Sequence, residues 1–136
     1  EEYGVQVEQV INCGGIAEKN PLVMQIYADV CARPMKISRS AQTCALGAAI
    51  FGAVAAGAHP TVEAAQAAMT GVKKTVYEPI AANVAVYREL YQVYKTLHDA
   101  FGTKEFTGSL SGVMKNLIRI RERARKGQSF EGMAHA

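Results

Sequence analysis

The sequence predicts an α/β fold, because short alternating or apolar runs typical of strands are followed by longer stretches with helical spacing. Residues 5–13 read V-Q-V-E-Q-V-I-N-C, which indicates a strand whose C-terminal half is buried in a sheet. That strand runs directly into Gly14 and Gly15. With about half of its 136 residues apolar, the chain is long enough to bury one core of its own.

A helix is predicted from Asn20 to about Ala32, and a short strand over residues 35–39 follows it. Asn20 is suited to be the N-cap residue, and Pro21 stands at the first helical position, where its missing N–H costs nothing. Asp29 lies eight residues into this helix, about 12 Å along its axis from the start. We therefore expect Asp29 to have a structural role.

Small apolar residues fill the stretch from residue 43 to Gly57, where a helix C-cap glycine is expected. Apolar side chains almost all round indicate a buried helix, and its length of about 14 residues is too short to span a bilayer. A short helix capped by Thr61 runs to about Met69, and residues 73–78 read as an edge strand that ends at Pro79.

The longest periodic segment covers residues 80–101, and its aromatic stripe is expected to pack inward as core. A glycine-rich loop over residues 102–112 leads to a basic helix and a loose end over residues 127–136. We therefore expect a domain portion over 1–101, a loop over 102–112 and a basic helical tail over 113–136. No internal repeat is visible.

The net charge of +3 is concentrated in residues 113–126, which carry six cations against one anion and leave −2 for the rest. No aromatic residue is interleaved among those arginines to stack on bases, so a solvated helix is favoured over a nucleic-acid site. Without an initiator Met or a signal sequence, we expect a cytoplasmic protein and a piece of a longer one. Cys13, Cys31 and Cys44 have no metal spacing and are expected to be buried free thiols.

The stretch with most chemical information is the strand, the glycine pair and the helix start at Asn20. Glycines at the end of a buried strand let a planar or phosphorylated ligand approach the backbone, and a helix N-terminus offers N–H groups to an anion. The pattern is neither G-x-x-x-x-G-K-[ST] nor G-x-G-x-x-G, and a tight turn is the simpler interpretation. The charges of Glu18 and Lys19 are expected to be solvated in a loop, and the three histidines have no second ligand at metal spacing.

The longer string resembles the C-terminal adenosine motif of the FGGY carbohydrate kinases. It runs N-C-G-G-I-A-E-K-N-P-L-V-M-Q-I-Y-A-D-V, then R-P-M-K-I, then A-Q-T-C-A-L-G-A-A-I-F-G-A. The N-C-G-G entry and residues 42–49 are most similar to the branch of the family that phosphorylates ribulose. The resemblance covers residues 5–100 well and the tail loosely.

The resemblance implies part of the C-terminal ribonuclease-H-like domain of an actin-like ATPase fold, with extra C-terminal helices. It implies ATP and Mg²⁺ as cofactors, with Gly14 and Gly15 against the nucleotide and Asn20 at the adenine or ribose edge. The small-residue helix over 45–57 would pack behind them. No catalytic residue and no metal ligand is predicted in this chain, and the Mg²⁺ would be held mainly by the missing N-terminal part.

The resulting hypothesis is a C-terminal piece of a kinase that transfers phosphate from ATP to the terminal hydroxyl of a ketopentose in L-arabinose catabolism. The expected partners are ATP and, in the intact enzyme, the sugar, with no nucleic acid and no membrane; a homodimer stays open. One alternative is a sibling kinase acting on xylulose, glycerol or gluconate. Another is a non-catalytic module whose basic helix binds an acidic partner or RNA.

Overall fold

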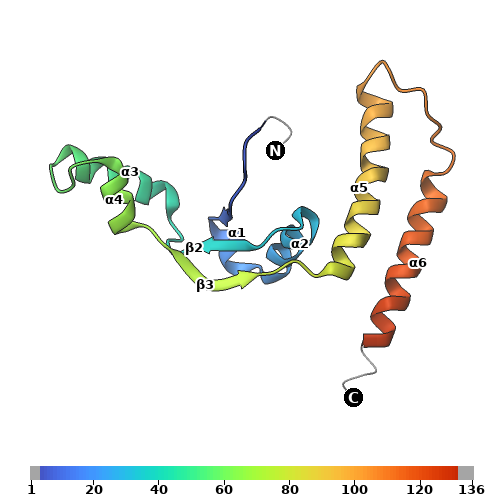
Figure 1. Cartoon of the computed structure of the whole chain (residues 1–136), viewed down its shortest axis with the longest axis horizontal. Helices are drawn as coiled ribbons and strands as arrows, with labels where there is room; N and C mark the ends of the chain where they lie inside the picture. The colour runs from blue at the N-terminus through green and yellow to red at the C-terminus, as the bar shows by residue number, and fades with distance from the viewer. Residues whose placement is uncertain (1–3, 132–136) are drawn as a thin grey trace. The chain divides into compact units, whose positions relative to one another are not determined.

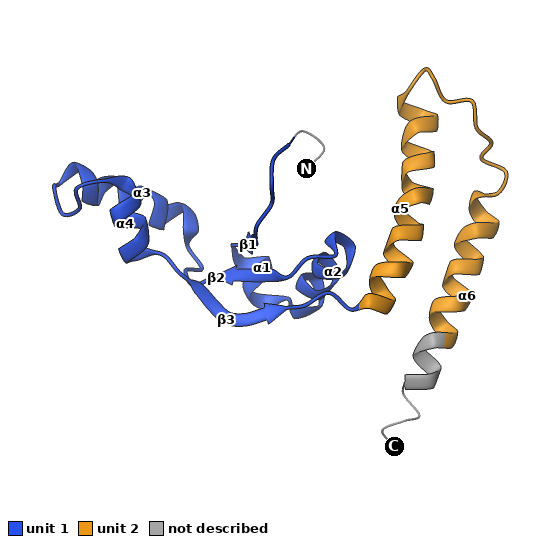
Figure 2. Ribbon diagram, in the orientation of Figure 1, with its two compact units in different colours: residues 1–80 blue, residues 81–136 orange. Residues whose placement is uncertain are grey.

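A computed structural model describes residues 4–131 of the chain, with side chains up to residue 126. The chain divides into two compact units, residues 1–80 and residues 81–136 (Figure 2). Unit 1 contains the sheet and four helices, and unit 2 contains two helices (Figure 1). The division after Ile80 groups the long helix with the basic one, whereas the sequence analysis placed a boundary after residue 101.

The sheet of unit 1 has three strands in the order β1-β2-β3. They are β1 (Val10–Asn12), β2 (Met35–Ser38) and β3 (Val72–Tyr77). β1 pairs with β2 in parallel, and β3 pairs with β2 antiparallel with an irregularity between Lys36 and Ser38. The predicted strands at 35–39 and 73–78 are therefore confirmed, the second as an edge strand.

The first strand is shorter and less buried than the sequence predicts. Only residues 10–12 pair with β2, and Ile11 is 47% exposed. The prediction of a strand buried in its C-terminal half is wrong for the described residues, because β1 lies at an edge of the sheet. Apolar residues alone do not reveal whether a strand has neighbours on both sides.

One face of the sheet is covered by two helices, α1 (Gly15–Lys19) and α2 (Pro21–Cys31). Buried Met24 of α2 joins Ala17 of α1 and Ile37 of β2 in the core, with Val23 and Tyr77 packed against it. The predicted start of α2 is confirmed. Asn20 is the N-cap residue, its Oδ1 accepts a hydrogen bond from Val23 N at 3.1 Å, and Pro21 stands at the first helical position.

Asp29 is the buried charged residue of this core, with 2% of its surface exposed. Its Oδ1 accepts hydrogen bonds from Gln25 Nε2 at 3.0 Å and from the backbone N–H of Ile80 at 2.7 Å. Gln25 also donates to the carbonyl of Glu78 at 2.8 Å. The structural role predicted for Asp29 is confirmed, because it ties α2 to the chain that leaves β3.

Two further helices, α3 (Thr43–Ala55) and α4 (Val62–Met69), pack on each other. Gly57 has φ +74° and follows the C-cap Ala56, and the N–H groups of Gly57 and Ala58 donate to Val54 and Ala53 in a Schellman motif. Thr61 caps α4 through a hydrogen bond to Ala64 N, as predicted. Both ends of the connection thus follow from local sequence signals.

The burial predicted for α3 is wrong in the described residues, because of its side chains only Ile50 is buried and Phe51 is 64% exposed. A β-carbon added at Gly47 or Gly52 would meet nothing within 4 Å, so no other backbone lies close to these glycines. α3 touches α4 along one side, whereas its apolar surface extends all round.

The prediction of buried thiols is also wrong, since Cys13, Cys31 and Cys44 are free and exposed. Cys13 directly follows β1, Cys31 is the last residue of α2, and Cys44 lies in the first turn of α3. In the described part of the chain, no neighbouring element covers these three positions. Cysteine is small and apolar, which favours burial, but residue type alone does not show whether a position at the end of an element is covered.

Unit 2 is a pair of antiparallel helices, α5 (Ala81–Gly102) and α6 (Val113–Glu131), joined by the predicted loop. Buried Ile120 of α6 lies in their contact, and Arg123 of α6 donates to the Glu89 carboxylate of α5. The helix extends to residue 131, so residues 127–131 are helical and do not form the loose end predicted for 127–136. Residues 132–136 lie outside the described part of the chain.

The stripe predicted to pack inward from α5 does so only in part: Val84 is buried and Tyr87 is half-buried. Tyr91, Tyr94 and Phe101 are 57%, 61% and 83% exposed, whereas Leu90 and Leu97 are half-buried. The aliphatic residues of the helix therefore make its core face, and the aromatic residues lie beside that face. Across residues 4–131, no helix is both long enough and apolar enough to cross a membrane.

We predict that Asp29→Ala destabilises the 136-residue chain by about 1–3 kcal/mol, because the Ile80 N–H then loses its acceptor. Asp29→Asn keeps an oxygen at that position and should lose less. Urea denaturation measures both. Asp99→Ala, which removes an exposed ion pair with Lys95, is the control and should cost less than about 1 kcal/mol. Equal losses for all three variants would contradict the role assigned to Asp29.

A second prediction concerns the pH dependence of unit 2. The hydrogen bond from Arg123 lowers the pKa of Glu89 from its ordinary value of 4.5. Because the folded pKa is depressed, this contribution to stability is present above pH 4.5 and is lost as the pH falls through the lowered pKa. The melting temperature of wild type should exceed that of Glu89→Gln at pH 7, and the gap should close at low pH. If this difference in melting temperature persists at low pH, or if Glu105→Gln shows an equal difference at pH 7, the Glu89–Arg123 pair is not its source.

Candidate functional site: the glycine pair after the first strand

The candidate site begins where β1 ends, at Cys13 and Gly14. Gly14 has φ +87° and ψ 175°, a backbone conformation that is almost exclusive to glycine. Its carbonyl accepts a hydrogen bond from Glu18 N at 3.2 Å, so Gly14 also acts as the N-cap residue of α1. The chain therefore requires a glycine at this position for its turn, whatever binds there.

The two glycines are open on their outer side. A β-carbon added at Gly14 or at Gly15 would meet no atom within 4 Å, and Gly15 is exposed. The pair is thus not sealed inside the core. The backbone at the C-terminal end of β1 is accessible to a flat ligand, a necessary condition for the predicted role.

Asn20 lies five residues beyond Gly15, between α1 and α2. Its side-chain oxygen already accepts the N–H of Val23, and the residue is exposed. The amide NH₂ group of Asn20 can therefore donate to a further partner while the oxygen stays on Val23.

Helix α1 is the element that the sequence analysis missed, since residues 15–19 were expected to form a loop. Ala17 is 3% exposed and lies in the core with Met24 and Ile37, which holds this single turn on the sheet. Glu18 forms an ion pair with Lys73 of β3, and the side chains are 31% and 34% exposed. Glu18 thus lies on a helix instead of in the predicted loop, and its carboxylate, which is exposed as predicted, is paired. The helix-forming run I-A-E-K was the available signal.

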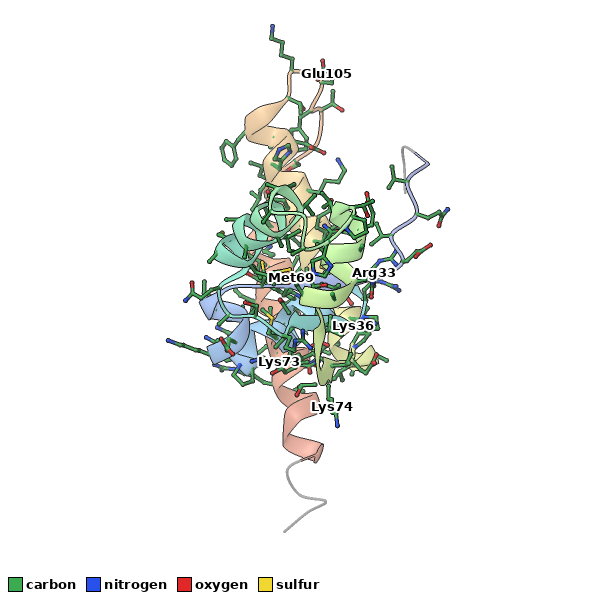
Figure 3. The ribbon with its side chains drawn as sticks, turned by 90° about the vertical axis from the view of Figure 1, so that its left-hand side faces the viewer. Arg33, Lys36, Met69, Lys73, Lys74 and Glu105 are labelled. Atoms are coloured by element: carbon green, nitrogen blue, oxygen red, sulfur yellow. The ribbon has the colours of Figure 1, made fainter. Side chains whose placement is uncertain are left out.

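Two hollows are present elsewhere on the described surface. One, of about 170 Å³, is lined by Glu8, Gln9, Val10, Arg33, Pro34 and Lys36. Arg33 and Lys36 lie near one another in Figure 3, where Arg33 donates to the carbonyl of Val7 and Lys36 to the side chain of Gln9. The other, of about 470 Å³, is an open depression around the loop after α5. Gly14, Gly15 and Asn20 line neither hollow.

Two of the three histidines, His59 and His98, lie among the described residues. No group of three or more His, Cys, Asp or Glu side chains there is arranged to hold a metal ion, whereas His135 lies outside them.

Residues 1–56 match the model of the C-terminal domain of the FGGY family of carbohydrate kinases. The match contains β1, the glycine pair, α1, α2, β2 and α3. The chain thus belongs to the FGGY family, which confirms the resemblance seen in the sequence, and its α/β unit 1 contains part of the C-terminal domain of such a kinase.

The relatives lie in one branch of that family. The chain is 49% identical over 129 residues to the ribulokinase of Geobacillus thermodenitrificans, 91% of this chain and 22% of the relative. It is 48% identical over 122 residues to that of Halalkalibacterium halodurans, 87% of this chain and 21% of the relative. The chain therefore spans about a fifth of the length of the curated relatives it matches, and it corresponds to a C-terminal part of them.

Proposed function

We propose that this chain forms the adenosine-facing side of the ATP cleft of a ribulokinase. The proposal includes the ribonuclease-H-like domain of an actin-like ATPase fold, with residues 1–101 as the domain portion, 102–112 as a loop and 113–136 as a helical tail. The observation that carries it is the open glycine pair directly after β1, inside the stretch that matches the family. Without side chains, these residues leave room for a nucleotide on the backbone.

In this proposal the base or ribose of ATP lies over Gly14 and Gly15, and Asn20 donates its amide N–H to an acceptor on the adenosine. The oxygen of Asn20 stays on Val23 and keeps the start of α2 fixed. Asn20 therefore serves both the helix and the ligand. Helix α3, which was expected to pack behind the glycines, packs on α4 in the described residues instead, and its uncovered apolar surface would find a partner in the intact protein.

The whole enzyme would transfer the γ-phosphoryl group of ATP to the terminal hydroxyl oxygen of a ketopentose, in the L-arabinose catabolism of the cytoplasm. The hydroxyl proton would pass to a carboxylate outside this chain, and Mg²⁺ would be held mainly by residues outside it as well. Both parts must come together around the substrates for turnover. The chain contributes nucleotide binding.

We propose no nucleic-acid partner for the basic helix α6. Arg121 pairs with Glu122, and Arg123 pairs with Glu89 of α5. Part of its positive charge is therefore used within unit 2, in agreement with a solvated helix that packs on α5.

The nucleotide site is tested by substitutions at the glycine pair in the full-length protein. Gly15 has no close neighbour, so Gly15→Val should leave the melting temperature nearly unchanged but raise the KM for ATP about tenfold, which corresponds to about 1.4 kcal/mol. The KM for the sugar should not move. Gly102→Ala in unit 2 is the control. An unchanged KM for ATP in Gly15→Val would remove the glycine pair from the site.

By contrast, Gly14→Ala should destabilise the fold itself by about 1–3 kcal/mol, because its φ of +87° is strained for any residue with a β-carbon. The Gly15→Val variant therefore tests nucleotide binding, whereas the Gly14→Ala variant tests the stability of the fold.

Turnover tests the division of labour between this chain and the rest of the enzyme. ADP release with ATP and L-ribulose should be at background for the 136-residue chain and readily measured for the full-length protein. D-xylulose and glycerol serve as the comparison substrates. Turnover by the 136 residues alone would show that the chain contains a catalytic base, contrary to the proposal. A preference for glycerol over L-ribulose would indicate a glycerol kinase instead of a ribulokinase.

A further inference from the structure

The long helix α5 carries two apolar seams with the same spacing. The first contains aliphatic residues four, three, four and three positions apart, and all of them are half-buried: Val86, Leu90, Val93, Leu97 and Ala100. Because α5 and α6 are in contact and these residues are half-buried, we infer that this seam faces α6. Apolar residues repeated every 3.5 positions are typical of helices that pack along their length.

The second seam repeats the same spacing with rings: Tyr87, Tyr91, Tyr94, His98 and Phe101. The ring centroids of Tyr91 and Tyr94 are 6.2 Å apart, and so are those of Tyr94 and His98. Tyr91, Tyr94 and Phe101 are more than half exposed. A helix with two such seams is typical of a position between two other helices, and only the α6 seam is covered in the described residues.

Exposed apolar residues of α6 extend this surface. The Glu89–Arg123 ion pair marks one side of the helix pair. At 100° per residue, Tyr94 and Phe101 project from α5 on the side away from Glu89. By the same geometry Met114 and Ile118, which are 66% and 48% exposed, project from α6 on the side away from Arg123.

The second seam of α5 and these two residues of α6 therefore lie on the same side of the pair. We call this surface the apolar face of unit 2; its residues are Tyr87, Tyr91, Tyr94, His98, Phe101, Met114 and Ile118. Because an uncovered surface of this kind is costly in water and marks an interaction site, it requires a partner.

The margins of the apolar face are positively charged. Arg88 and Lys95 follow its outer edge on α5, and at 100° per residue Arg121 and Arg125 continue the line of Met114 and Ile118 along α6. The anions at these margins are Asp99, which pairs with Lys95, and Glu122, which pairs with Arg121. Four cations against two anions favour an acidic partner.

A second copy of this chain does not meet that requirement. Of the described helices, α2 carries one acid, the buried Asp29, α3 carries none and α4 carries only Glu63. A copy of unit 2 would place the same cationic margins opposite each other, which is unfavourable. The occupant must therefore come from a different polypeptide segment.

We propose that the apolar face of unit 2 binds an acidic amphipathic helix supplied by the remaining part of the parent kinase. The chain spans only 22% of the length of a relative that matches 91% of it, so most of the relative's polypeptide lies outside the aligned region. The proposed helix places its apolar residues between the aromatic seam of α5 and Met114 and Ile118, with carboxylates at the two margins. The inference rests on the proposed function only in that the chain is part of a longer kinase.

Photo-crosslinking in the full-length protein tests this. A benzophenone amino acid replaces Tyr94, and mass spectrometry identifies the linked peptide. The linked peptide should come from outside these 136 residues and carry acidic residues beside an apolar stripe. The same probe at Gln92, which is exposed on the opposite side of α5, is the matched control and should not link to that peptide. A link to a second copy, a link to unit 1, or no link at all would overturn the proposal.

Charge reversal tests the acidic character of the occupant. Arg121→Glu together with Arg125→Glu should reduce the crosslink yield at Tyr94 several-fold, whereas Arg119→Glu, on the side of the helix pair that carries Glu89, should leave it unchanged. Equal yields in both variants would overturn the acidic assignment. Because the crosslink is measured without ATP or sugar, its outcome is independent of the turnover assay, and the failure of one proposal is distinguishable from the failure of the other.

Discussion

The fold of unit 1 depends on one buried carboxylate. Asp29, on α2, accepts the N–H of Ile80 where the chain leaves β3, and Gln25 from the same helix binds both Asp29 and the carbonyl of Glu78. A charge with 2% exposure is tolerated only where hydrogen bonds replace its hydration. These contacts hold α2 against the end of β3, so that Met24 reaches Ile37 and the helix layer covers one face of the sheet.

The same layer presents the candidate site. Ala17 fastens the short helix α1 to the core, and Glu18 ties it to β3 through Lys73. Gly14 turns the chain between β1 and α1 with a backbone that only glycine adopts readily. Rigid elements on either side of an open glycine pair are what a nucleotide site needs, because the backbone is held in place before the ligand arrives.

The exposed apolar surfaces of α3 and α5 have the same physical explanation. Helix α3 is apolar all round but packs mainly on α4, and Tyr91, Tyr94 and Phe101 of the aromatic seam of α5 are more than half exposed. Soluble proteins rarely leave large continuous apolar surfaces of this kind exposed to water, and such surfaces mark interaction sites. In a chain that spans about a fifth of its relatives, such surfaces agree with contacts to further parts of a larger protein.

The sequence by itself determined the elements and the family. Caps at Asn20, Thr61 and Gly57 placed helix ends because hydrogen bonds to the first and last turns are local. The glycine pair with its following strings identified the kinase family, while its contact with a nucleotide stays a prediction.

Only the tertiary structure decided what is buried. Ile80, which donates to Asp29, and Lys73, which pairs with Glu18, each lie more than fifty residues away from their partner in the sequence. The exposure of α3, the cysteines and the aromatic seam likewise depends on which neighbours are present. Periodicity shows that a face is apolar, but which chain segment covers it is a long-range property that no local pattern encodes.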